Sequence, residues 1–162
     1  MLFEQHGYDN TTVEQIAAAA GVSLRTFYRY CSSKDEAFTF RLTTGPAELA
    51  FAVRAKADLP LLEAVIAAFV EVSEIESRRR ELRLMITTPA LRAAWLAAGR
   101  EAQEDLARII LERAPDQSAL QARARAAAIT GVLTTVIETW ATSDTGKIEP
   151  LTREALRVLG PA

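Results

Sequence analysis

Apolar residues recur at helical spacing along almost the whole length of the 162-residue chain. Between Ile129 and Trp140, for example, they lie at offsets 0, 3, 4, 7, 8 and 11, which places them on one face of a helix. No stretch alternates apolar and polar residues in the manner typical of a strand. The sequence therefore predicts an all-α protein with about nine helices.

Short helices are expected at the N-terminus. Residues 1–6 have the pattern of the last turns of a helix that ends at Gly7, and the beginning of this helix is expected to be missing from the sequence. Two overlapping capping boxes follow, one starting at Thr11 and one at Thr12. They predict the start of a second helix, which ends at Gly21.

Residues 20–23, Ala-Gly-Val-Ser, join this helix to a third one. Gly21 suits the left-handed backbone of a tight turn, and Ser23 can cap a helix that runs to Tyr30. Two short helices with this connection form a helix-turn-helix, in which the N-terminal end of the second helix faces the major groove of DNA. The core of this small module is expected to contain four apolar residues, Phe3, Ile16, Val22 and Phe27.

Longer helices are expected after this module. A helix that begins at Lys34 is expected to kink or break at Gly45-Pro46. This point divides the chain into a helix-turn-helix domain, residues 1–43, and a larger helical domain, residues 44–162. Further helices are expected over residues 61–75, 78–86, 89–113, 117–142 and 150–159. The three arginines at 78–80 are interpreted as a solvated helix start or as part of the linkage to the first domain.

The composition excludes several kinds of site. A single cysteine, Cys31, excludes an intramolecular disulfide, and with a single histidine, His6, the chain lacks a convincing set of zinc ligands. No nucleophile, base and orienting group occur together, so neither an enzyme nor a bound cofactor is expected. No apolar run reaches about 18 residues, so a cytoplasmic protein without a membrane partner is expected. Because the net charge is −2, any contact with DNA must be local.

The module closely resembles the DNA-binding domain of the tetracycline-repressor (TetR) family. Residues 7–17, 20–23, 26–30 and 33–36 carry the resemblance, which extends over about residues 2–38. One position departs from the family pattern, because Cys31 stands where Phe is usual. The resemblance implies operator DNA as a partner and assigns DNA contacts to ten residues: Thr11, Thr12, Ser23, Leu24, Arg25, Thr26, Tyr28, Arg29, Tyr30 and Lys34.

Each group of these residues has an implied role. Thr11 or Thr12 is expected to contact phosphate at the start of the supporting helix. Residues 24–26 are expected to reach base edges, where Arg25 can pair with guanine and a threonine methyl can touch thymine. Tyr28, Arg29 or Tyr30, and Lys34 are expected to bind the phosphate backbone.

The larger domain is expected to serve dimerisation and ligand sensing. Four large side chains could line a ligand pocket, although their helical spacing also describes an ordinary core: Phe51, Phe69, Met85 and Trp95. Thr134 is a candidate polar group of the same pocket. Family members pair through their last two long helices, and small residues allow a close approach there. The homodimer contact is therefore expected at Ala124, Ala128, Gly131 and Leu156.

Together these features predict a sequence-specific transcriptional regulator. The first hypothesis is a repressor that a small, mainly hydrophobic effector releases from a palindromic operator. The alternative is a dimeric DNA-binding regulator with no small-molecule ligand.

Overall fold

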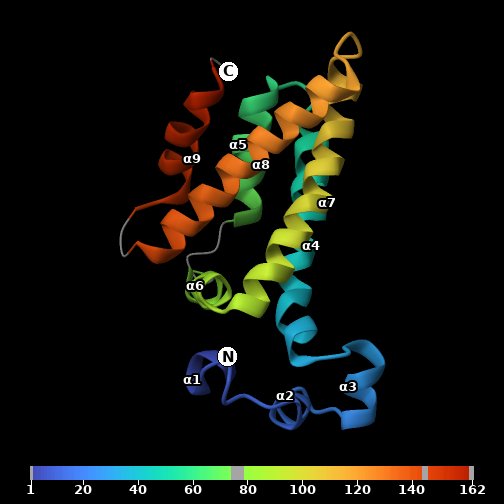
Figure 1. Cartoon of the computed structure of the whole chain (residues 1–162), viewed down its shortest axis with the longest axis vertical. Helices are drawn as coiled ribbons and strands as arrows, with labels where there is room; N and C mark the ends of the chain where they lie inside the picture. Colours follow the sequence, from blue (N-terminus) through green and yellow to red (C-terminus); the bar gives the residue numbers. More distant parts are fainter. Residues whose placement is uncertain (1, 74–78, 144–145, 161–162) are drawn as a thin grey trace.

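The computed structural model describes residues 2–73, 79–143 and 146–160, which form nine α-helices, a short 3₁₀ helix and no strand (Figure 1). The helices are α1 (Leu2–His6), α2 (Val13–Ala19), α3 (Leu24–Tyr30), α4 (Lys34–Ala55), α5 (Leu61–Ser73), α6 (Arg79–Thr87), α7 (Pro89–Arg113), α8 (Ala119–Thr142) and α9 (Ile148–Leu156), followed by the 3₁₀ helix Arg157–Leu159. This architecture confirms the predicted all-α fold.

The helices α1, α2 and α3 form a small module with the start of α4, at the lower end of the molecule in Figure 1. Gly7 follows α1 with a φ of 76°, and Gly21 follows α2 with a φ of 67°. Both values lie in the left-handed region, which a glycine enters without the steric cost of a side chain. The helix ends predicted at these two glycines are thus confirmed.

One of the two overlapping capping boxes forms at the start of α2. The hydroxyl of Thr12 accepts a hydrogen bond from the backbone N–H of Gln15 at 3.3 Å, and the Gln15 side chain accepts one from the N–H of Thr12 at 2.9 Å. Thr11 instead donates its hydroxyl to the carbonyl of Gly7 at 2.7 Å. The second box is absent because this neighbouring threonine binds the end of α1.

The predicted break at Gly45-Pro46 does not occur. The helix α4 is assigned without interruption from Lys34 to Ala55, so the expected domain boundary at residues 43–44 falls inside a helix. A proline within a helix costs about 3 kcal/mol locally. Here α4 packs along α7 and against α5, and this burial of its C-terminal half outweighs the local cost.

The larger body is built around one core to which α4, α5, α7, α8 and α9 contribute. In Figure 1, α4 and α7 run side by side along the long axis, and α8 crosses from the upper end of α7 to α9, which lies on the other side of the body. The largest fully buried side chains of this core are Val53, Val65, Ile109, Ile110, Ile129, Trp140 and Leu156. The predicted apolar face of α8, from Ile129 to Trp140, supplies much of it.

A second buried cluster includes residues from both the module and the larger body. Phe3, Tyr8 and Phe38 come from the module, and Met85, Leu91 and Trp95 come from α6 and the start of α7. The rings of Phe3 and Phe38 pack edge to face with their centroids 5.0 Å apart. The helix α6 lies directly above the module in Figure 1 and carries Met85 into this cluster.

None of the helices in the described ranges is long and apolar enough to cross a membrane. Across the same ranges, no group of three or more His, Cys, Asp or Glu side chains is arranged to hold a metal ion.

Candidate functional site

The start of α3 is fixed by a serine cap. The hydroxyl oxygen of Ser23 accepts a hydrogen bond from the backbone N–H of Thr26 at 3.1 Å. The hydroxyls of Ser23 and Thr26 also lie 3.0 Å apart and share a hydrogen bond. Ser23 therefore defines where the helix begins, and the Thr26 side chain is partly engaged within the chain. This confirms the predicted cap.

The opposite faces of α3 differ in chemistry. Phe27 is buried, whereas Arg25, Tyr28 and Arg29 are exposed. These three residues lie at positions i, i+3 and i+4, so they share one side of the helix. The helix contains two arginines and no acidic residue. This stripe presents guanidinium and phenol donors, which are suited to phosphate oxygens and to guanine edges.

Aromatic contacts organise the end of α3. The guanidinium of Arg29 lies 4.8 Å from the ring centroid of Tyr30 and donates to its hydroxyl at 3.1 Å. The Tyr28 ring packs edge to face on Phe27 with a centroid distance of 5.5 Å. Both tyrosines are exposed and keep their hydroxyl groups at the surface of the module.

Two predicted phosphate contacts have other partners within the chain. Thr11 is only 1% exposed, so its side chain is not on the DNA-facing surface, and this part of the prediction is wrong. Its hydroxyl satisfies the carbonyl of Gly7, which remained unpaired at the end of α1. Lys34 is half-buried and donates to the carbonyls of Tyr8 and Thr11 at 3.0 and 3.3 Å. Thr12, by contrast, is exposed beside the start of α2.

The core of the module differs in part from the expectation. Phe3 and Phe27 are buried and Ile16 is half-buried, but Val22 is 37% exposed because it lies in the turn before Ser23. Sequence reasoning missed Tyr8, which is buried and stacks on Phe3 at 5.7 Å. Because Tyr8 directly follows Gly7, the sequence pattern places it in a loop, and no neighbouring residue indicates that its side chain is part of the core.

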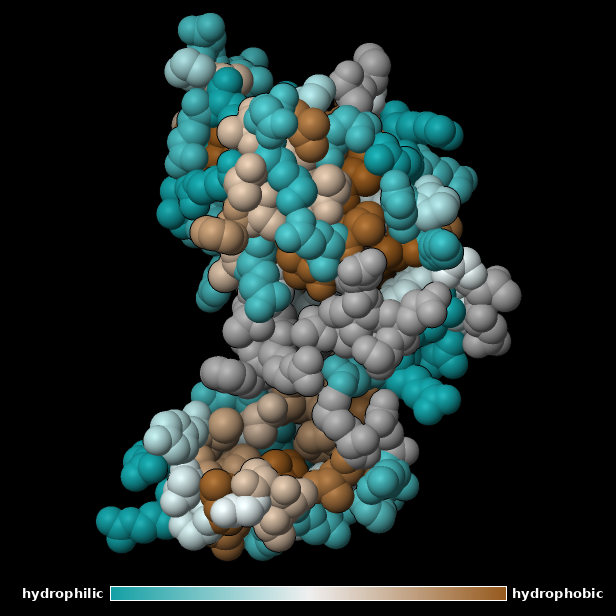
Figure 2. Space-filling view, turned by 180° about the vertical axis from the view of Figure 1, so that it is seen from behind, coloured by the Kyte–Doolittle hydropathy of each residue, from teal (hydrophilic) through white to brown (hydrophobic). Residues whose placement is uncertain are grey.

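Hydrogen bonds lower the pKa of two carboxylates in the module. The hydroxyl and backbone N–H of Ser32 both donate to the carboxylate of Glu36 at 2.6 Å and lower its pKa. The pKa of Glu14 is lowered by its own backbone N–H and by the Thr12 hydroxyl. Figure 2 shows apolar and weakly polar atoms, rather than strongly hydrophilic ones, over much of the rear face of the module.

Comparison with known proteins places this geometry in a family. Residues 1–38 match the family model described as bacterial regulatory proteins, tetR family. Residues 59–162, more than half of the chain, match the model described as the MftR C-terminal domain. The chain belongs to the TetR family. Members of this family are DNA-binding transcriptional regulators and not enzymes.

Individual relatives agree with this assignment. The HTH-type transcriptional regulator TcmR of Streptomyces glaucescens is 39% identical over 125 residues, covering 69% of this chain and 55% of that protein. The putative mycofactocin biosynthesis transcriptional regulator MftR of Mycobacterium tuberculosis (strain ATCC 25618 / H37Rv) is 29% identical over 118 residues, covering 69% and 60%. The chain thus spans little more than half the length of these relatives.

A solved structure shares the fold. The crystal structure of the TetR family transcriptional regulator PfmR from Thermus thermophilus superposes with a TM-score of 0.54 at 20% identity, covering 98% of this chain and 92% of that one.

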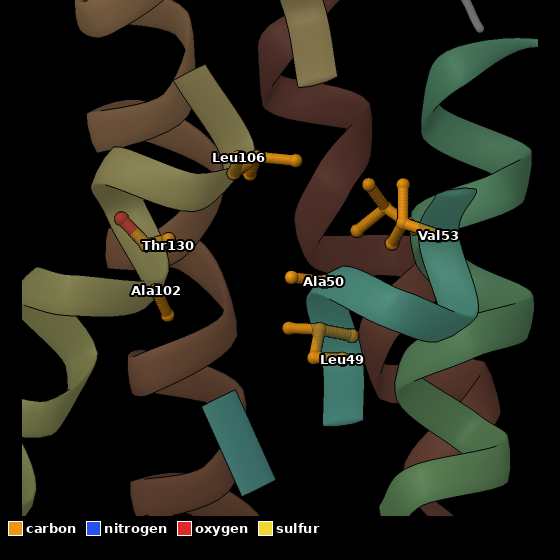
Figure 3. A pocket seen from close by; sticks show the side chains of 7 residues that line it. Leu49, Ala50, Val53, Ala102, Leu106 and Thr130 are labelled. Carbon is orange, nitrogen blue, oxygen red and sulfur yellow. The ribbon is translucent and has the colours of Figure 1, made fainter. Parts of the chain in front are cut away.

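The larger body of this TetR-family chain contains a small apolar cavity between α4, α5, α7 and α8 (Figure 3). Its volume is about 10 Å³, enough for about one water molecule. Thr130 supplies the polar side chain of the lining, and its hydroxyl donates to the carbonyl of Ala126 at 2.9 Å. The lining residues are Leu49, Ala50, Val53, Val65, Ala102, Leu106 and Thr130.

None of the five residues expected to line a ligand pocket borders this cavity. Phe51 is 77% exposed because it lies on the outer side of α4. Phe69 packs in the main core, while Met85 and Trp95 belong to the second cluster. Thr134 is half-buried on α8. Ordinary core packing, the alternative reading of these residues, thus describes three of them.

Three of the four residues expected at the dimer contact lie at the surface of α8. Ala124, Ala128 and Gly131 are all exposed there. Leu156 is 2% exposed inside the chain's own core, so its expected place on a dimer surface is wrong. Two large apolar residues that sequence reasoning missed are also exposed: Leu120 on α8, at 78%, and Val158 just after α9, at 75%.

Proposed function

We propose that this chain is a sequence-specific DNA-binding transcriptional regulator that places α3 in the major groove. The observation that supports this most directly is the exposed stripe of Arg25, Tyr28 and Arg29 on a helix whose start is capped by Ser23. A helix-turn-helix presents its second helix to DNA in this way. Membership of the TetR family supports the same function.

Within this proposal the exposed residues divide into two kinds of contact. Leu24 and Arg25 lie in the first turn of α3, where side chains reach base edges, and the half-buried Thr26 follows them in the same turn. Tyr28, Arg29 and Tyr30 lie further along and bind phosphate oxygens, as does the exposed Thr12 at the start of α2.

The substitution Arg25→Ala tests the base contact. We expect it to weaken binding to a duplex that the wild-type chain enriches from a random-sequence library by roughly 1–3 kcal/mol, the discrimination of one bidentate pair. Binding to an unselected duplex of the same length should change much less. Fluorescence anisotropy measures both affinities, and Arg108→Ala on α7 is the matched control. Equal losses on the two duplexes would contradict a base-reading role.

The chain is further proposed to act as a homodimer that pairs through the outer face of α8 and α9. Small exposed residues on α8 allow a second copy to approach closely, and burial of Leu120 and Val158 would remove apolar surface from water. Two recognition helices related by a two-fold axis read a palindromic site with half-sites about one helical turn apart. Repression by occupancy of such an operator is the proposed outcome.

A small, mainly hydrophobic effector is proposed to bind at the apolar cavity between α4 and α7. The cavity holds only about one water molecule, so binding must be coupled to a separation of these helices. Because α4 continues into the module, a ligand that favours the separated state would change the spacing of the two α3 helices.

The alternative, a dimeric regulator without a ligand, is favoured by the small size of this cavity. Thermal unfolding in the presence of a library of hydrophobic compounds discriminates between the two proposals. The effector proposal expects stabilisation by at least one compound, and Ala102→Phe, which fills the cavity, should abolish it. The absence of stabilisation with every compound favours the alternative, whereas stabilisation that persists in Ala102→Phe contradicts binding at this cavity.

A further inference from the structure

We propose that Lys34 is a positioning residue that fastens the connection between α1 and α2 to the start of α4, and that it is not a phosphate contact. This inference rests on the proposed DNA-binding function. It concerns how the helix-turn-helix is held in the geometry that DNA requires.

The ammonium group of Lys34 is bound within the chain. It donates to the carbonyl of Tyr8 at 3.0 Å and to the carbonyl of Thr11 at 3.3 Å. Its nitrogen also lies 4.3 Å from the ring centroid of Tyr8. An ammonium has three N–H donors. Two carbonyls and the face of an aromatic ring therefore surround this group.

The segment that Lys34 holds also has hydrogen bonds of short range. Thr11 donates to Gly7, and the Asn10 side chain donates to the carbonyl of His6 at 3.1 Å, so both bonds return to the end of α1. The hydrogen bonds from Lys34, by contrast, reach 26 and 23 residues back along the chain. They join the connection after α1 directly to the first turn of α4.

The position of α2 depends on this connection. Thr12, the N-cap of α2, directly follows Thr11, whose carbonyl Lys34 binds. The Tyr8 ring beneath the ammonium packs against Phe3 and, edge to face, against Phe38 of α4 at 6.5 Å. Lys34 thus sets the start of the supporting helix relative to the element that also follows the recognition helix. To reach a phosphate, Lys34 would have to give up both hydrogen bonds, and the Tyr8 carbonyl would keep only the backbone N–H of Thr11 at 3.3 Å.

The variants Lys34→Met and Lys34→Arg distinguish the two roles on DNA. We expect both variants to bind the enriched duplex with roughly tenfold or more lower affinity. Lys34→Met loses hydrogen bonds from a charged donor, which are among the stronger ones. In Lys34→Arg, the planar guanidinium cannot reproduce the contacts of the ammonium group with two carbonyls and a ring. The dependence of log K on log salt concentration should keep the wild-type slope. Arg29→Met, which removes a proposed phosphate contact, should lower the slope by about 0.9.

A phosphate contact makes the opposite prediction for the same variants. Lys34→Met would then lower the slope by about 0.9, and Lys34→Arg would restore the wild-type affinity. Either result overturns the proposal, as does a Lys34→Met protein that is fully folded and binds with wild-type affinity.

Hydrogen exchange of the free chain tests the fastening without DNA. Amide protons of residues 8–15 should exchange at least several-fold faster in Lys34→Met than in the wild type, while those of α7 and α8 stay unchanged. Arg108→Met, a control on α7, should leave residues 8–15 unaffected. Unchanged exchange in Lys34→Met overturns the proposal. If the wild-type chain enriched no duplex, the proposed DNA-binding function would fail, and the exchange experiment would still decide the role of Lys34.

Discussion

At the scale of single residues, Thr11 and Thr12 have opposite environments although they are adjacent and chemically identical. Thr11 is buried and donates to a backbone carbonyl, whereas Thr12 is exposed and accepts from the first turn of α2. The difference arises because each end of a helix leaves unpaired groups of one kind, carbonyls at the end of α1 and N–H groups at the start of α2. A threonine hydroxyl can serve either, and its position along the chain decides which.

The buried hydroxyl of Thr11 makes a contribution that can be measured. Thr11→Val keeps the shape of the side chain but leaves the Gly7 carbonyl without its donor, so we expect a loss of about 1–2 kcal/mol in the free energy of unfolding. Urea denaturation followed by circular dichroism measures it. Thr11→Ser, which keeps the hydroxyl, should lose less. A Thr11→Val protein as stable as the wild type would show that this hydrogen bond contributes nothing net.

At the scale of elements, α6 connects the end of α8 to the N-terminal module. Its Met85 lies in the second buried cluster with residues of the module. At the middle of α6, Arg83 donates to the carbonyl of Ala141 at 2.8 Å. At its start, Arg79 donates to the carbonyl of Gly146 at 2.8 Å, and its guanidinium lies 4.4 Å from the centroid of the Trp140 ring. Of the three predicted arginines, Arg78 lies outside the described residues, and Arg79 binds the segment after α8 rather than the module.

The hydrogen bond from Arg83 places a positive charge at the C-terminal end of α8, where carbonyls lack helical partners. We expect Arg83→Met to lower the free energy of unfolding by about 1–2 kcal/mol, since a charged donor is lost. Chemical denaturation measures the change, and Arg80→Met, at an exposed position of the same helix, should change it by less than about 0.5 kcal/mol. Similar losses in both variants would count against a specific contribution from the Arg83 contact.

At the scale of the whole molecule, the module and the larger body share α4. The far end of this helix is held by Arg113, which donates to the carbonyls of Val53, Lys56 and Leu59 at 2.6, 3.0 and 3.1 Å. Since α4 is a single helix, the packing of its C-terminal half sets the direction in which its N-terminal half carries the module. A change in the packing of α4 at the cavity would therefore also change the position of α3.

The proposed dimer can be tested with one glycine. A Cβ atom added at Gly131 would have no atom of another described element within 4 Å. The variant Gly131→Arg should therefore fold normally. On the exposed face of α8 it should block a second copy and shift the chain to a monomer, as measured by analytical ultracentrifugation. Gly99→Arg on α7, where a Cβ is equally free of neighbours, should remain dimeric. A monomeric wild type, or a dimeric Gly131→Arg, would contradict this interface.

Much of the helix-turn-helix, and the start of α7 in the larger body, could be predicted because the signals are local. The left-handed turns at Gly7 and Gly21, the cap at Ser23 and the first turn of α7 at Pro89 each depend on a few neighbouring residues, and each prediction agrees with the structure. The identity of the family follows from the same short segment. The pocket was not predictable in this way, because the spacing that places Phe69 or Met85 on an inner face does not say whether a core or a cavity lies there.

The sequence by itself determined the helical class, most helix ends and the outward residues of α3, because hydrogen-bonding groups and backbone preferences act within one or two turns. Only the tertiary structure decided that α4 continues through Pro46, that Thr11 and Lys34 turn inward, and that Leu156 is buried while Phe51 is not. Each of these outcomes depends on which part of the chain packs against the side chain or helix concerned. Such packing contacts join residues far apart in the sequence, and the free energy gained by burial outweighs local conformational preference.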